Sequence, residues 1–469
     1  MLQTILDYIL LIFVVVMLFN IIIFVHELGH FLAGKWRGLQ IDRFQIWFGK
    51  PIWKKEIKGV QYGLGWIPAG GFVALPQMAP MEAIEGGDKD RAPLPKITPL
   101  DKIIVAFAGP LFSLLLALAA AVVVWGVGKP KDFVPSTTVG FVLENSPAEK
   151  AGILPGDEIL KINGKEVNGF AGTLESITES IVLSSGDKIK FTLKREGVEE
   201  PIVVTSKFEI PPSRFWQRTG LRQVGLAPAG DAKIAGIIKN SPADKAGLAE
   251  GDVIVSVDGK PLYSDIQLAQ YLKAQDNATV LLEVKKAAGE MVSVSITPAK
   301  PKKPADRDPM IGVMWDQRGD VDVRIVHPNP FRQMADSLTM MWVTVTKVLD
   351  PRSSIGVDHL SGPVGIGKVM FSFMQMEDGW MRVLGFMVLF NVNLAVLNML
   401  PFPVLDGGHI TLAILEKIAG KPVQAKALEI IQTACALGLI SLMLYVTSKD
   451  IGDGFGRGGG DSEEVIFAE

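Results

Sequence analysis

Five consecutive residues near the N-terminus have the types and spacing of a metal-dependent hydrolytic site. Residues His26 to His30 read H-E-L-G-H, an H-E-x-x-H sequence. Residues four apart on a helix share one face, so both imidazoles can reach a single metal ion. Glu27 lies beside them, where a carboxylate can take the proton of a metal-bound water. The motif therefore predicts zinc-dependent hydrolysis, with His26 and His30 as ligands and Glu27 as the base.

The segment in front of this motif is strongly apolar. Ile9 to Val25 is interrupted by one polar residue, Asn20, and leads directly into the motif. Met1 to Tyr8 contains no Lys or Arg, and no small-residue cleavage site separates the apolar run from the motif. We therefore expect a retained membrane helix here and not a signal peptide, which places the hydrolytic site inside a membrane.

The overall composition fits a membrane protein that also has ordinary globular parts. The chain has 469 residues, of which 48% are apolar and 21% charged, and its mean hydropathy is +0.30. A net charge of −3, without a basic run, speaks against nucleic acid as a partner. The single cysteine, Cys435, excludes an internal disulfide and a cysteine-based zinc site.

Three further segments are apolar enough to span a bilayer, which takes ~20 residues per helix. They are Ile103 to Val127, Val383 to Leu400, and Ala427 to Val446. Lys and Arg are concentrated in the loop between the first two spans and in the loop between the last two, and the N-terminal tip has none. The positive-inside rule then predicts that both loops face the cytoplasm and both termini face outward. The stretch between the second and third spans is expected to be extracytoplasmic.

That stretch contains an internal repeat. The sequence S-P-A-x-K-A-G occurs from Ser146 and again from Ser241, and G-D-x-I with an Asn-Gly or Asp-Gly turn follows at the same distance each time. Each unit reads as a strand, a short helix, another strand and a tight turn. The series resembles PDZ domains of the bacterial, protease-associated kind. Such domains bind extended peptides, often chain ends, along a sheet edge; a pair used only as a steric spacer is the alternative.

A catalytic zinc site normally has three protein ligands and one open position, so a third ligand is needed. Position 36, where longer zinc motifs continue with histidine, is Trp. Asp406 follows the third span and is predicted at the same membrane depth as the two histidines. An acidic residue there is costly unless it is paired or binds a metal, although it could also be a solvated turn residue before Gly-Gly. The remaining histidines are His327, His359 and His409.

Taken together, these motifs resemble the site-2 protease family of zinc intramembrane metalloproteases, in its bacterial branch with tandem PDZ domains. The likeness rests on HELGH in the first span, on N398-M-L-P-F-P-V-L-D406-G in the third, and on the PDZ-like pair between them. It covers the chain to about Asp450. The resemblance implies that His26, His30 and Asp406 hold zinc and that Glu27 activates the water.

The resemblance also implies contacts to an unwound substrate, whose exposed backbone needs hydrogen-bond partners in lipid. Val60 to Leu75 is apolar and glycine-rich, which suggests a re-entrant β-hairpin; a cytoplasmic surface loop is the alternative. Asn393 and Asn398 are amides in an apolar helix that could bind the substrate backbone or the developing oxyanion. They could equally join helices within the bundle. The candidate substrate-binding residues are Asn393, Asn398, Gly70, Gly71 and Phe72.

The predicted fold is therefore a multi-pass α-helical membrane protein with four transmembrane helices, a re-entrant β-hairpin and two extracytoplasmic α+β PDZ-like domains. An amphipathic helix after the linker at 301–308, with apolar residues from Phe331 to Val348, is expected on the bilayer surface or against the second module. Ser361 to Gly365 resembles a family segment without an evident role.

The predicted boundaries are 1–34 (first span), 35–98 (cytoplasmic and re-entrant β region), 99–128 (second span), 129–218 and 219–304 (PDZ-like domains), 305–379 (linker and amphipathic helix), 380–408 (third span), 409–425 (cytoplasmic loop), 426–449 (fourth span) and 450–469 (disordered tail).

The predicted function is zinc-dependent endoproteolysis of single-span membrane proteins in or near their transmembrane segments, in a bacterial inner membrane. The family implies pre-trimmed substrates such as an anti-sigma factor in stress signalling, and remnant signal peptides. Two alternatives stay open. One is a membrane-anchored PDZ scaffold with an inactive metal site, and the other is a membrane-embedded zinc hydrolase of soluble peptides or lipid amides. Cleavage products that come from within a hydrophobic span would favour the intramembrane protease over both alternatives.

Overall fold

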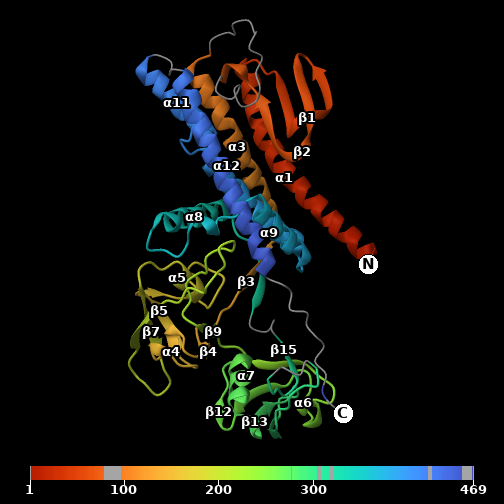
Figure 1. Ribbon diagram of the computed structural model, residues 1–469, viewed down its shortest axis with the longest axis vertical. Coiled ribbons are helices and arrows are strands. Elements are labelled where there is room, and N and C mark those ends of the chain that lie inside the picture. The colour runs from red at the N-terminus through yellow and green to blue at the C-terminus, as the bar shows by residue number, and fades with distance from the viewer. Residues whose placement is uncertain are drawn as a thin grey trace. The chain divides into compact units, whose positions relative to one another are not determined.

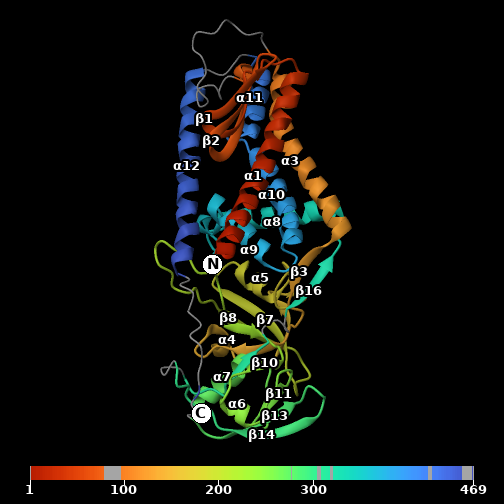
Figure 2. The same cartoon turned by 90° about the vertical axis from the view of Figure 1, so that its right-hand side faces the viewer.

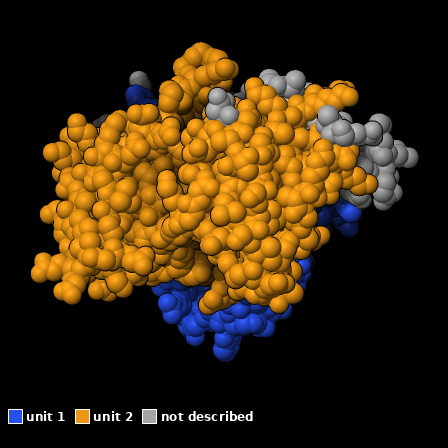
Figure 3. Space-filling view, turned by 90° about the horizontal axis from the view of Figure 1, so that it is seen from below, with its two compact units in different colours: residues 1–130, 325–345, 360–451 blue, residues 131–324, 346–359, 452–469 orange. Residues whose placement is uncertain are grey.

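The computed structural model describes residues 2–78, 97–275, 277–303, 308–316, 321–420 and 425–456, together with Phe467. The chain divides into two compact units, which Figure 3 colours separately. The first comprises Met1–Pro130, Ile325–Val345 and Leu360–Ile451. The second comprises Lys131–Arg324, Thr346–His359 and Gly452–Glu469. The first unit contains the apolar helices, and the second contains the PDZ-like repeats.

Four helices of the described chain are long and apolar enough to cross a membrane. The candidate spans are Tyr8–Trp36, Pro99–Val127, Gly379–Asn398 and Leu428–Asp453. They lie in α1 (Leu2–Trp36), α3 (Pro99–Val127), α10 (Gly379–Asn398) and α12 (Ala425–Gly456), visible in Figures 1 and 2. The prediction of four spanning helices is confirmed. The fourth helix continues through 450–456, the first part of the predicted tail.

α3 is the central helix of this unit. It begins with a capping box, in which the Thr98 side chain accepts from the Asp101 backbone and Asp101 accepts from the Thr98 backbone. Reciprocal capping of this kind satisfies two otherwise unpaired backbone donors. From there α3 packs against α1, α10 and α11 (Asp406–Ala419). Residues 409–425 were predicted as a loop; the structure instead starts α11 at Asp406, so that residue lies in a first helical turn.

The predicted hairpin forms from β1 (Arg43–Ile57) and β2 (Val60–Ala74), with the 3-10 turn η1 (Pro76–Met78) after it. Arg43 to Ile46 pairs on both sides, with Gln61 to Leu64 and with Gly71 to Ala74, so the hairpin folds back on itself. The buried Gln45 donates from Nε2 to the carbonyls of Trp47 and Gly49, at 3.0 and 2.9 Å. These bonds satisfy backbone acceptors where the strand pairing is irregular.

Three further helices or turns connect the third span to the rest of the chain: α8 (Pro330–Leu349), η2 (Val357–His359) and α9 (Pro363–Gln375). α8 packs through Met334 on a small cluster of α3 and α10, and leaves Phe331 and Trp342 exposed. The Ser361–Gly365 segment forms the start of α9. There the amides of Gly362 and Gly365 donate to Asp450 of α12, at 3.0 and 2.8 Å. This segment therefore joins α9 to the fourth span.

The second unit contains two modules of the same design. The strands of the first are β4 (Val139–Val142), β5 (Glu158–Ile162), β6 (Lys165–Glu166), β7 (Lys188–Lys194), β8 (Ile202–Lys207) and β9 (Leu226–Pro228), with helices α4 (Pro147–Lys150) and α5 (Ile177–Val182). The strands of the second are β10 (Ala232–Ile237), β11 (Val253–Val257), β12 (Lys260–Pro261), β13 (Val280–Lys285), β14 (Met291–Ile296) and β15 (Val313–Trp315), with helices α6 (Pro242–Lys245) and α7 (Asp265–Ala274). β3 (Lys129–Phe133) pairs with β16 (Asp322–Val326).

The repeated sequence motifs are caps and charge anchors of these modules. Ser146 and Ser241 each accept a backbone N–H three residues on, at 3.2 Å, as helix N-caps. Asp157 accepts from the Leu154 backbone and pairs with Arg195, and its counterpart Asp252 accepts from the Ala249 backbone and pairs with Lys286. Each aspartate is almost fully buried. The repeat therefore encodes the same local architecture twice.

Each module closes with a strand outside its predicted range. β9 pairs with β4 beyond residue 218, and β15 pairs with β10 beyond residue 304. Both strands have only three residues, which is too short for a pattern of alternating hydrophobicity to be read from the sequence. Apolar clusters fill both modules, centred on Phe191 in the first and Leu282 in the second.

Candidate metal centre and active site

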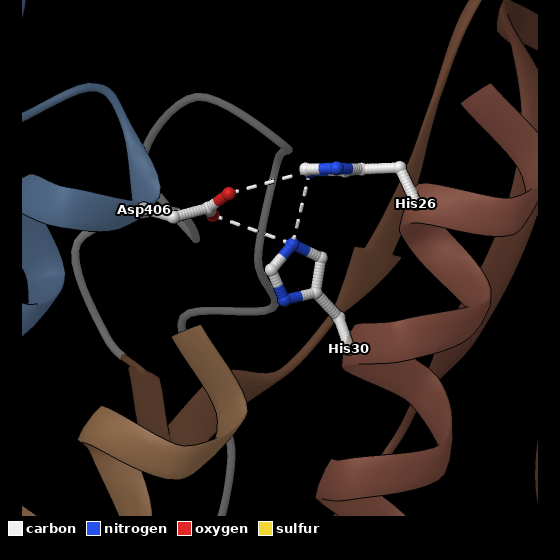
Figure 4. Close-up of side chains that lie close together, drawn as sticks. All are labelled: His26, His30 and Asp406. Atoms are coloured by element: carbon white, nitrogen blue, oxygen red, sulfur yellow. Dashed lines mark hydrogen bonds and ion pairs between the residues drawn. The ribbon is translucent and has the colours of Figure 1, made fainter. Parts of the chain in front are cut away.

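His26 and His30 on α1 and Asp406 on α11 meet at one point (Figure 4). The Nε2 atoms of His26 and His30 lie 3.3 Å from Asp406 Oδ2 and Oδ1, respectively. The two Nε2 atoms are themselves 3.3 Å apart. All three ligand atoms lie within 4.8 Å of one another. Three converging side chains with one imidazole pair and one carboxylate are the donor set of many catalytic zinc sites.

The second nitrogen of each imidazole is occupied by α3. His26 Nδ1 lies 3.0 Å from the Ser113 hydroxyl oxygen, and His30 Nδ1 donates to the Val105 carbonyl at 2.8 Å. Ser113 and Val105 are both fully buried. A protonated Nδ1 leaves the Nε2 lone pair free for a metal and fixes the orientation of the ring. The residues present therefore fit a zinc ion, and α3 is the element that aims the histidines.

Asp406 has a buried carboxylate oxygen that is free to bind a metal ion. It is mostly buried, and its Oδ2 accepts no hydrogen bond within the described part of the chain, although His26 Nε2 is nearby. Burial alone would raise the pKa of this carboxyl, and the imidazoles of His30 and His26 lower it when they are protonated. When both imidazoles are neutral metal ligands, the positive charge that keeps the carboxylate ionised has to come from the metal ion. A carboxylate that stays ionised while buried needs a compensating cation, which a metal ion supplies.

Two glycines allow the site to be this compact. A Cβ on Gly109 of α3 would lie 2.2 Å from His30 Nε2 and 2.9 Å from His26 Nε2. A Cβ on Gly29, inside the H-E-L-G-H motif, would lie 2.3 Å from the Ala108 carbonyl oxygen. Real side chains do not approach so closely, so Gly29 is needed for α1 to pack against the α3 backbone, and Gly109 leaves the space that the two imidazoles occupy.

Glu27 lies in the same hollow, which has a volume of about 290 Å³. Its lining comes from α1, β2, α3, α10 and α11, and includes Glu27, Gly70, Gly71, Asn398, Asp406 and His409. Gly71 is close to the base, since a Cβ built on it would lie 3.5 Å from Glu27 Cγ. The Gly71–Ala74 stretch of β2 pairs with β1 on one side, and no other described strand covers its second edge. An open strand edge is a template for an extended peptide.

The candidate substrate residues fall into two groups. Gly70, Gly71 and Asn398 line the hollow, as the prediction of substrate contacts requires. Asn393 and Phe72 are not among its lining residues: Asn393 Oδ1 is buried without a hydrogen-bond partner in the described chain, and Phe72 stacks on Phe48 at 6.3 Å between ring centroids. The structure therefore brings three of the five predicted contacts to the hollow.

His409 also lines the hollow, one helical turn beyond Asp406, but it is not part of the ligand cluster. Burial lowers its pKa, so the imidazole is expected to be neutral. The other two histidines have different partners. His327 Nδ1 lies 3.0 Å from the Trp125 carbonyl, and His359 Nε2 lies 2.9 Å from the Thr219 carbonyl. Asp406 is therefore the third side chain that the fold brings to His26 and His30.

Sequence reasoning missed the contributions of α3. Ser113, Gly109 and the Val105 carbonyl all lie within an apolar span, and small residues in such a helix are expected simply from helix packing. The Gly109-Pro110 pair was the available signal, because glycine and proline inside a helix mark a close approach or a special backbone position.

The geometry defines a membrane-protein hydrolase with a metal site between helices, and comparison with known proteins identifies the family. Residues 13–443 match the model of Peptidase family M50. The chain belongs to this family and is a zinc metalloprotease of the multi-pass, intramembrane type.

Curated relatives match over nearly their whole length. The Regulator of sigma-E protease RseP of Escherichia coli (strain K12) is 28% identical over 449 residues, which cover 91% of this chain and 94% of that protein. The Regulator of sigma E protease of Haemophilus influenzae is 26% identical over 443 residues, covering 92% and 96%. Among solved structures, the PDZ domain of an SdrC-like protein from Listeria innocua matches 19% of this chain and 96% of its own, with 23% identity and a TM-score of 0.17.

Proposed function

We propose that this protease cuts single-span membrane proteins within or near their transmembrane segments, toward the cytoplasmic side. The observation that carries the proposal is the position of Glu27 and the His26–His30–Asp406 cluster. Both lie in a hollow between helices that are long and apolar enough to span a bilayer. Bulk water is scarce at such a depth, and so are soluble substrates.

We assign the chemical roles as follows. His26, His30 and Asp406 would hold zinc, which when bound supplies a Lewis acid and a water of lowered pKa. Glu27 would take the proton from the attacking water and later deliver it to the leaving amine. The Asn398 amide would donate to the scissile carbonyl oxygen as negative charge develops on it. Each group lines the same hollow, so all of them could reach one peptide bond.

A substrate helix must be unwound before its carbonyl can be attacked, because its backbone groups are paired within the helix. We propose that the free edge of Gly71–Ala74 binds the unwound segment as an added strand, next to Glu27. Gly70 and Gly71 would let the substrate backbone come close. This proposal is supported by the one-sided pairing of that edge and by the short distance from Gly71 to Glu27.

The wider setting follows from the family resemblance and the relatives' names. We propose a bacterial inner-membrane location, with the PDZ-like modules outside the cytoplasm and the metal site toward the cytoplasmic face. The substrate would be a pre-trimmed membrane protein, such as an anti-sigma factor, with remnant signal peptides as a second class. The modules would read chain ends or exclude bulky outer domains.

The test is cleavage of a single-span reporter by the purified protein in lipid nanodiscs, with the products mapped by mass spectrometry. The proposal expects one dominant cut inside the hydrophobic span. It also expects slower cleavage when a folded domain is fused to the outer end of the same reporter. Products that come only from soluble loops would contradict intramembrane cleavage, and equal rates for both reporters would contradict size exclusion.

A further inference from the structure

Phe467 is buried in the second PDZ-like module, far along the chain from the elements around it. Its exposed fraction is 5%. It walls a hollow of about 550 Å³ whose other residues come from α6, from the end of β14 and from the segment after β14. Those residues include Asn240, Pro242, Lys245, Thr297 and Lys300. A phenylalanine this well covered removes a large apolar surface from water.

The ring lies directly against Gly312, in the loop that leads into β15. A Cβ on Gly312 would lie 3.0 Å from Phe467 Cε2. Gly312 has a φ of +80°, and the same added Cβ would collide with Ser241, 2.3 Å away. Ser241 and Phe467 therefore both pack against Gly312 at the position where a side chain would start.

The first module fills the equivalent place differently. Gly225 is the counterpart of Gly312, and an added Cβ there would meet Ser146 in the same way. The next neighbour of Gly225, however, is Leu143 of the module itself, 3.2 Å from the added Cβ. In the second module, Phe467 from a remote part of the chain is nearest after Ser241, whereas in the first module it is Leu143, just after β4.

The charges of the hollow and of the sequence around Phe467 are complementary. Lys245 and Lys300 line the hollow beside Phe467. The sequence around Phe467 carries Asp461, Glu463, Glu464 and Glu469 and no basic residue after Arg457. An apolar anchor flanked by acidic residues is complementary to a basic rim around an apolar wall.

The Phe467 site is separate from the groove in which a PDZ-like module is expected to bind peptides. That groove, with a volume of about 590 Å³, is lined by α7, by the loop at 308–312 and by β15, and also by Phe141, Leu143 and Glu144 of the first module. The two hollows have no lining residue in common, but Gly312 lines the groove and also touches Phe467. Phe467 therefore contacts the loop at Gly312 without being one of the residues that line the groove.

We propose that the second PDZ-like module has a second peptide site, formed by α6, the end of β14 and Gly312, and that the chain's own segment around Phe467 is its ligand. The phenyl ring is the anchor, and the acidic residues that flank it in the sequence are opposite in charge to Lys245 and Lys300. This inference does not depend on the proposed substrate of the protease.

Hydrogen exchange of the full chain in detergent tests the proposal. Three amides hold the loop beside Phe467: Ile238 donates to Gly312, Ala243 to Ile311 and Ala299 to Met310, at 2.9, 2.8 and 3.1 Å. In Phe467→Ala their exchange should be about tenfold faster or more, because burial of a phenyl ring no longer stabilises the loop. The matching amides of the first module, Leu143 and Ala148, should not change.

Phe215→Ala is the matched control, because Phe215 is 85% exposed; it should leave all five amides unchanged. A synthetic peptide with the sequence of residues 461–469 should restore protection in Phe467→Ala, and more weakly at high salt. The same peptide with alanine for phenylalanine should not. Unchanged exchange in Phe467→Ala would overturn the proposal. Protection in the parent that disappears on dilution would overturn the assignment to the chain's own segment, because it would mean a contact between copies.

Discussion

Gly109 of α3 lies so close to His30 of α1 that a Cβ on the glycine would come within 2.2 Å of the imidazole Nε2. A side chain at position 109 would thus meet a proposed metal-binding nitrogen first. The absence of a side chain on α3 at this point therefore leaves the room in which the histidines can hold a metal.

We expect Gly109→Ala to abolish zinc binding and cleavage, because the added methyl group occupies the space of the histidine nitrogens. Gly126→Ala in the same helix is the control, since a Cβ there meets nothing within 4 Å. Zinc content by atomic absorption, measured on both variants, checks this. Full zinc occupancy in Gly109→Ala would show that the helices can separate without loss of the site.

Ser113→Ala should weaken zinc binding by about tenfold or more, the usual effect of removing a hydrogen bond that orients a ligating histidine. At saturating zinc most of the activity should return, because Ser113 orients His26 and does not touch the substrate. Ser337→Ala removes another buried helical serine whose hydroxyl donates to the Gln333 carbonyl at 2.8 Å, and it should leave zinc affinity unchanged. Competition with a chelator gives both affinities, and equal values would refute the orienting role.

Gln45→Leu should damage the hairpin without touching the metal site. It removes the donors to the carbonyls of the half-buried Trp47 and of Gly49, and the loss of each net hydrogen bond costs about 0.5–1.5 kcal/mol. We expect normal zinc content and slower cleavage, with faster hydrogen exchange across residues 43–46 and 71–74. Gln40→Leu, at an exposed position, is the control. Loss of zinc in Gln45→Leu would mean that the hairpin also shapes the metal site.

Asp252 should make the second module sensitive to acid. Burial would raise the pKa of its carboxyl, but hydrogen bonds from Lys286 and from the Ala249 and Ala287 backbones lower it below its ordinary value. Since the unfolded chain has a pKa of about 3.9, the stabilisation is complete above that pH and is lost as the pH falls toward the folded pKa. Asp252→Asn should lose about 2 kcal/mol at pH 7 and progressively less below pH ~4. Hydrogen exchange of β11 and β13 measures the stability of the module at each pH, and Glu250→Gln, at an exposed position, is the control. A stability loss in Asp252→Asn that stays the same in acid would contradict the role of the ionised carboxylate.

The sequence was most informative where a pattern has a strict physical meaning. The i, i+4 spacing of His26 and His30 predicted a helix that turns both imidazoles toward one metal ion, and α1 has this arrangement. The long apolar runs predicted four helices able to span a membrane, and four such helices are present in the described chain. Asp406 could be proposed because an acid at that depth needs a partner, but its place in the first turn of α11 was missed since Asp-Gly-Gly is typical of a turn. Ser113 and Gly109 could not be identified, because small residues in a membrane helix have many uses. The partner of Gly312 lies too far along the chain for any local pattern to reveal Phe467.

The central claim is that His26, His30 and Asp406 hold zinc while Glu27 performs the proton transfer. The most direct test measures zinc per chain and cleavage of a single-span reporter in the parent, in Glu27→Gln and in Asp406→Asn. We predict one zinc per chain with cleavage in the parent, retained zinc without cleavage in Glu27→Gln, and loss of both in Asp406→Asn. Full zinc occupancy in Asp406→Asn would contradict the assignment of the third ligand, and cleavage by Glu27→Gln would contradict the assignment of the base.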